Sequence, residues 1–245
     1  TLASTNYDGD TEGSYTVKVK YGEFSADVVV NVKVLPNYKK LGYGDVTPIE
    51  TAANETGVTR GLPSVGNPKV LVIPVAFIDY KADANMKSTL EKAFFGTSED
   101  TGWESLNSYY KKSSYGKLDI GGTVTDVYNT GKSSSYYENQ YTGENAPEYE
   151  IIEGALEYFD SKIDYAEYDA DNDGYIDGIY LVYTAPVDKS GDSYWWAFTY
   201  EYYTETPTYY DNKEADFYMF LGYEFFFETP ASKTSLTINC ETIIH

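Results

Sequence analysis

The sequence is poor in positive charge, histidine and cysteine. Its 245 residues hold 18 Lys and Arg against 39 Asp and Glu, which gives a formal net charge of −21. A surface this negative repels phosphate groups, so we expect no nucleic-acid partner and no binding to anionic membrane surfaces. The single cysteine, Cys240, excludes a disulfide framework. The longest apolar run, residues 70–78, is about half the ~20 residues that cross a bilayer, so we expect no membrane insertion.

Aromatic residues, in contrast, are abundant. They make up 17% of the chain and include 28 Tyr; hydrophobic residues reach 42% and charged residues 23%, which is typical of a globular protein. A Tyr-rich, Asp-rich and Lys-poor composition suits an exported bacterial protein, secreted or held at the cell surface. The chain starts at Thr1 rather than an initiator methionine, and His245 follows an apolar pair. We therefore expect both ends to lie within a longer chain.

Residues 14–34 predict a β-hairpin. Tyr15, Val17 and Val19 alternate with polar residues, and a second alternating run follows a turn at residues 21–23. Two strands do not fold alone in water, so the hairpin should belong to a larger sheet. The stretch GSYTVKVKYGEFSADVVVNVKV resembles the final strands of a bacterial Ig-like domain, to which residues 1–35 are assigned. Residues 36–68 are rich in Pro and Gly and predict a linker.

From residue 69 to 245 the pattern mixes helices and strands without strict alternation, which predicts an α+β domain. Strands are expected at residues 70–78, 118–127, 176–184, 195–200 and 216–227. Helices are expected at 86–94 with Asp83 as cap, around 103–110, from Pro147 onward, and starting at Ile238. The continuous apolar run of the first strand predicts a central strand, although Pro74 inside it prefers an edge or a bulge.

The helix after Pro147 has a clear apolar stripe. It is formed by Ile151, Ile152, Ala155, Leu156 and Phe159. Four glutamates on the same helix allow a two-carboxylate glycosidase interpretation; they are Glu148, Glu150, Glu153 and Glu157. The last three lie opposite the stripe, which favours a solvated face.

The strongest motif is a D-x-D-x-D-G loop. Carboxylates at its positions 1, 3 and 5 converge on a hard cation because the chain turns sharply at the glycine, and positions 7 and 9 extend the ligand shell. The expected calcium ligands are Asp169, Asp171, Asp173, the carbonyl of Tyr175, and Asp177. Position 12 is Tyr180 instead of the bidentate Glu of an EF-hand, so we expect a structural Ca²⁺ loop with a ligand supplied from elsewhere. The alternative is a solvated acidic turn.

The last six residues, CETIIH, resemble the start of a zincin helix, in which T-I-I-H continues into H-E-x-x-H. With the segments VLVIPVAFIDY, FFGTSED, SLNSYYKKSSYGKLDIGGTV, YDADNDGYIDGIYLVY and WWAFTYEY, the region from residue 69 resembles the catalytic domain of the immune inhibitor A (thuringilysin-type) family of bacterial zinc metallopeptidases. The resemblance covers about 175 residues in the family's order and implies a zincin-like N-terminal subdomain.

The resemblance implies a zinc metallopeptidase that hydrolyses peptide bonds of a protein or peptide substrate. In that family, histidines at i and i+4 bind Zn²⁺ and the intervening Glu acts on a zinc-bound water. Only the first zinc ligand is present here, as His245, and no catalytic residue lies within the chain. The zinc site would be completed only beyond residue 245, so this chain itself should be inactive.

A different class of function stays open: a calcium-stabilised, non-catalytic surface module that binds glycans or host proteins. Trp195 and Trp196 allow a sugar-stacking platform, but adjacent strand residues point to opposite faces, so at most one serves and core packing is favoured. Cys240 is expected to be a small buried filler rather than a reactive thiol.

Overall fold

A computed structural model describes residues 2–3, 13–21, 24–32, 61–143, 145–188, 193–227 and 236–245. The chain divides into two compact units, Thr1–Gly57 and Val58–His245. Most of the predicted linker at residues 36–68 lies outside the described residues. Each unit is described by itself.

The first unit contains a three-stranded antiparallel sheet of β1 (Leu2–Ala3), β2 (Gly13–Tyr21) and β3 (Phe24–Val32) in that order. The predicted hairpin is confirmed as β2 and β3, with Val17 paired to Val28. The Val28 side chain is 45% exposed. The assignment of this sheet to an Ig-like domain stays a prediction.

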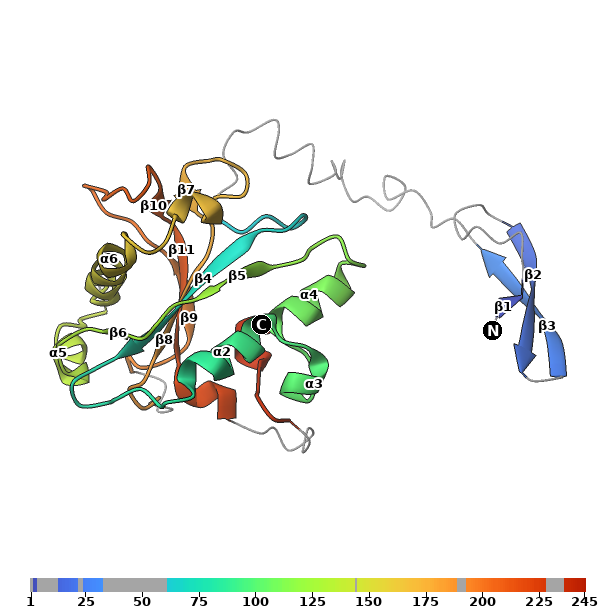
Figure 1. The fold of residues 1–245 in the computed structure, drawn as a ribbon, viewed down its shortest axis with the longest axis horizontal. Helices are drawn as coiled ribbons and strands as arrows, with labels where there is room; N and C mark the ends of the chain where they lie inside the picture. Colours follow the sequence, from blue (N-terminus) through green and yellow to red (C-terminus); the bar gives the residue numbers. More distant parts are fainter. Residues whose placement is uncertain are drawn as a thin grey trace. The chain divides into compact units, whose positions relative to one another are not determined.

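The second unit is built on a mixed sheet, which confirms the α+β class (Figure 1). Its central strands run parallel, and β9 forms an antiparallel edge beside β11. In spatial order the strands are β5 (Gly121–Val124), β4 (Lys69–Ala76), β8 (Ile179–Tyr183), β11 (Phe217–Gly222) and β9 (Phe198–Glu201), and β6 (Tyr128–Asn129) also pairs with β4. A separate parallel pair joins β7 (Tyr175–Ile176) to β10 (Glu214–Ala215).

Helices lie on both sides of this sheet (Figure 1). One side carries α2 (Met86–Phe95), α3 (Ser98–Thr101), α4 (Leu106–Ser113) and α7 (Glu241–Ile244). The other carries α5 (Ser134–Glu138), α6 (Glu148–Phe159) and the 3₁₀ turn η2 (Tyr165–Tyr168), while a second 3₁₀ turn, η3 (Tyr223–Phe227), follows β11. Among the described residues, no helix is long and apolar enough to span a membrane.

Strand β4 shows how the sheet separates two cores. Leu71 and Ile73 pack in the cluster that includes α6, whereas Val70 and Val72 pack in the cluster that includes α2, and all four are fully buried. A strand covered on both faces reads as a continuous apolar run. The predicted stripe of α6 is also confirmed, because all five of its residues are buried.

The first predicted strand, β4, is central, as its apolar run predicts. Pro74 fits there because it lies opposite the interval between the residues that pair with β5 and with β6, so its missing N–H removes no ladder bond on that side. Two other sequence predictions need correction. The strand expected at 216–227 ends at Gly222 and continues as η3. The cap of α2 is Asn85; Asp83 instead accepts the Asn85 amide.

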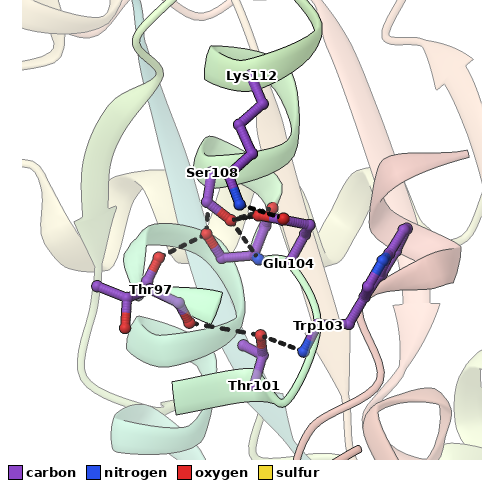
Figure 2. A network of polar contacts seen from close by, with 8 residues as sticks. Thr97, Thr101, Trp103, Glu104, Ser108 and Lys112 are labelled. Carbon is purple, nitrogen blue, oxygen red and sulfur yellow. Dashed lines mark hydrogen bonds and ion pairs between the residues drawn. The ribbon is translucent and has the colours of Figure 1, made fainter. Parts of the chain in front are cut away.

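Side-chain caps stand at the starts of α3 and α4 (Figure 2). The Thr97 amide donates to Asp100, and Ser105 and Ser108 bond reciprocally at the start of α4. Glu104 accepts from both Ser108 and Lys112. Such caps stabilise a helix start by about 1 kcal/mol each. We therefore assign this network to stabilisation of the two helices and not to binding or catalysis.

Candidate metal centre and the surroundings of His245

The acidic loop lies between η2 and β8. Asp169, Asp171, Asp173 and Asp177 each place one carboxylate oxygen within 4.8 Å of the others. Asp169 and Asp177 are buried, whereas Asp171 is exposed. The sequence therefore predicted correctly that these four side chains come together.

Local backbone geometry brings them together. Gly174 has φ +96° and Asn172 has φ +61°, so the chain turns through the left-handed region at both positions. The Gly174 and Asp173 amides donate to the two oxygens of Asp169 at 3.0 Å each. The Tyr175 amide donates to Asp173 at 2.9 Å. The loop is thus held in place by its own carboxylates.

Asp177 is the most deeply placed of the four, with 1% of its surface exposed. Its Oδ2 accepts from the Ala170 amide at 2.9 Å, but its buried Oδ1 makes no hydrogen bond within the described structure. Burial, together with the neighbouring carboxylates and against the Ala170 amide, raises the pKa of Asp177 to about 7. A buried acceptor without a donor costs free energy, and a cation between the four carboxylates would remove that cost.

Lys213, directly before β10, forms an ion pair with Asp169. In the described part of the chain, this ion pair brings one positive charge to the four carboxylates. Burial favours a higher pKa for Asp169, but the Lys213 ammonium and the loop amides together hold that pKa below its ordinary value. No fifth Asp, Glu, His or Cys of the described residues joins the group. Lys213 thus reaches the loop from elsewhere as a cation, and a further ligand such as a backbone carbonyl stays a prediction.

Position 12 of the motif takes no part in the loop. Tyr180 lies in β8 and packs edge-on against Phe94, with ring centroids 4.8 Å apart. What remains is a set of carboxylate oxygens around a tight turn. Hard cations such as Ca²⁺ prefer oxygen donors of this kind, so the residues present fit the expected ion.

His245 caps the short helix α7, whose last carbonyl, that of Ile244, accepts from the Tyr110 hydroxyl at 2.8 Å. His245 lines a cavity of about 270 Å³ to which Asp177 also contributes, and a second of about 500 Å³ bordered by Trp196 and Thr199. The imidazole thus lies beside the edge strand β9.

These residues do not form a zinc site by themselves. The chain has one histidine, and in the described residues His245 joins no cluster of three metal-ligating side chains. Cys240 is buried with its Sγ directed to the Ala93 carbonyl, and burial raises its thiol pKa to about 12. A catalytic zinc site needs about three protein ligands, which His245 and Cys240 cannot supply.

The tryptophans and glutamates considered in the sequence analysis differ in how exposed they are. Trp195 is 4% exposed and packs in the core, while Trp196 is 42% exposed. Both precede β9, which starts only at Phe198. Three of the glutamates on α6 are exposed as predicted, namely Glu150, Glu153 and Glu157.

Glu148 departs from this pattern: only 4% of it is exposed. The sequence analysis named Glu148 among the four glutamates of this helix but did not predict its burial, although a signal was present. Glu148 precedes Ile151 and Ile152 by three and four positions, so it continues the apolar stripe of α6.

No protein-family model matches the chain, and a comparison with curated proteins gives no significant match.

Proposed function

We propose that this chain is the sheet-bearing part of a secreted zinc metallopeptidase, with the acidic loop as its structural calcium site. The observation that carries the proposal is the cavity of about 500 Å³ shared by His245 and the edge strand β9. An exposed edge strand can bind an extended peptide through its backbone. A peptidase needs such a strand beside its reaction centre.

The proposal makes a definite demand on sequence. A glutamate should follow His245 directly, and a histidine should stand four positions after His245, because a helix then presents both imidazoles on one face. The 245-residue chain should hydrolyse no peptide bond, since His245 alone cannot hold a catalytic metal.

The test compares the 245-residue chain with a protein extended through that helix, using casein cleavage as the assay. We expect cleavage only by the extended protein, inhibition by 1,10-phenanthroline, and loss of activity in His245→Ala. Lys117→Ala is the control, because Lys117 is exposed and lines neither cavity beside His245. Cleavage by the short chain, or an extended protein indifferent to both treatments, would remove the peptidase proposal.

A second candidate is a calcium-stabilised binding module without catalysis. It is favoured by a cavity of about 790 Å³ with many aromatic side chains near Trp196. A sequence without glutamate directly after His245 would decide for this module.

A further inference from the structure

A large cavity lies at the start of α6, on the side of the sheet opposite α7. Its volume of about 790 Å³ is in the range of small-molecule sites, ~300–1,000 Å³. Aromatic side chains dominate its lining: Tyr141, Tyr149, Tyr194, Trp196, Phe198, Tyr200 and Tyr203.

The residues around the cavity differ in their contacts and exposure. The Tyr149 hydroxyl donates to the Glu201 carbonyl at 2.9 Å and accepts from the Tyr203 amide at 3.1 Å. Tyr200 and Tyr203 are 63% and 70% exposed. The cavity therefore combines a hydrogen-bonded inner wall with exposed aromatic residues at its rim.

One carboxyl group lies among these rings. Glu148 lines the cavity but is 96% buried, and its Oε1 accepts from the Tyr218 hydroxyl at 2.5 Å. Its other oxygen, Oε2, forms no hydrogen bond of good geometry within the described residues. Burial raises the pKa of Glu148, although the Tyr194 hydroxyl lies close enough to oppose that rise. No Lys, Arg or His is among the described residues that line the cavity.

This arrangement selects the chemistry of a ligand. A buried carboxylate is costly unless a donor or a positive charge pairs with it. Aromatic faces attract cations, and a planar guanidinium both stacks on rings and bonds to a carboxylate. The net charge of −21 also favours cations over neutral or anionic ligands near the protein surface.

We propose that this cavity binds the guanidinium group of an arginine side chain carried by a peptide or protein. Its N–H donors bond to Glu148 Oε2, and the rings of Trp196 and Tyr200 flank the charged plane. No residue of the acidic loop and no part of α7 lines this cavity, so arginine binding is tested apart from the zinc site, although Trp196 and Phe198 also border the cavity beside His245.

The probes are N-acetyl-arginine methylamide and its citrulline analogue, which keeps the shape but not the charge. Titration of the 245-residue chain, followed calorimetrically and by protein NMR shifts, should show at least ten-fold tighter binding of the arginine probe. Glu148→Gln keeps the size of the side chain and should abolish this preference. Glu157→Gln, an exposed glutamate on the same helix, should leave it unchanged.

Two further arms keep the test decisive. Tyr200→Ala changes an exposed ring, so it should fold normally and weaken arginine binding several-fold. A lysine probe should bind more weakly than the arginine probe. Equal binding of arginine and citrulline, an unchanged preference in a folded Glu148→Gln protein, or preferential binding of maltose would overturn the proposal.

Discussion

The second unit contains two acidic sites that differ in how their charge is arranged. In the acidic loop, four carboxylates lie within 4.8 Å of one another, and amides and Lys213 surround them. Among the described residues that line the aromatic cavity, the one carboxyl group is that of Glu148, which lies among tyrosine and tryptophan rings. Within the described part of the chain, one buried oxygen of Asp177 and one of Glu148 meet no hydrogen-bond donor in good geometry.

The arrangement of the carboxylates indicates which kind of cation each site prefers. Dense negative charge from hard oxygen ligands favours a small divalent ion. One carboxyl surrounded by π faces favours a large, weakly hydrated organic cation. The following experiments test whether the two sites respond to different cations.

Calcium should give the largest effect. With a dissociation constant of ~10⁻⁴ M, about 5 mM Ca²⁺ stabilises the fold by about 2 kcal/mol, and the melting temperature rises by about 4–8 °C relative to EDTA. Asp177→Asn should lose this rise, because it removes the deepest carboxylate charge. Glu148→Gln should retain it in full. Thermal denaturation followed by circular dichroism measures all three proteins.

A pH series tests whether the Glu148 carboxyl of the aromatic cavity is buried. Burial raises the pKa of Glu148 above its ordinary 4.5, against the Tyr218 hydrogen bond. The folded state then keeps a proton that the unfolded chain has released, so this residue's contribution to stability falls as pH rises above about 4.5. Glu148→Gln lacks this titration.

Urea denaturation between pH 4 and 8 should therefore show wild type losing stability relative to Glu148→Gln as pH rises. Parallel stability curves for the two proteins would contradict the buried position of the carboxyl.

Replacing Lys213 should have a smaller effect on Ca²⁺ binding than Asp177→Asn, and in the opposite direction. Its ammonium pairs with Asp169 and must compete with a bound cation, so Lys213→Gln should tighten Ca²⁺ binding by about five-fold, equivalent to about 1 kcal/mol. Lys117→Gln, an exposed lysine with the same charge change, is the control. A weaker Ca²⁺ affinity in Lys213→Gln would show that the lysine supports the loop.

The smallest expected effect is that of deleting residues 1–57. Every residue of both acidic sites lies in the unit Val58–His245, so the Ca²⁺ response and the arginine preference should persist within error. Failure of the shortened chain to fold cooperatively, judged by thermal melting, would show that the first unit is required.

Features with local causes were predictable from the sequence. The four aspartates gather because Gly174 turns the chain within their own segment, and the stripe of α6 follows from helical periodicity alone. The aromatic cavity was not predictable in this way. Glu148 meets Tyr218, which is 70 residues away along the chain, and only the sheet brings them together.

Pro74 gives the same lesson. A local rule places proline at an edge or bulge, yet here the break between β5 and β6 accommodates it in a central strand. That break depends on residues about fifty positions later, which no local pattern contains.

The central claim is that charge arrangement assigns a different cation to each acidic site. A calorimetric Ca²⁺ titration of wild type, Asp177→Asn and Glu148→Gln tests it most directly. We predict one Ca²⁺ per chain with a dissociation constant of ~10⁻⁴ to 10⁻³ M, lost in Asp177→Asn and unchanged in Glu148→Gln. No Ca²⁺ binding by wild type, or equal binding by Asp177→Asn, would contradict it.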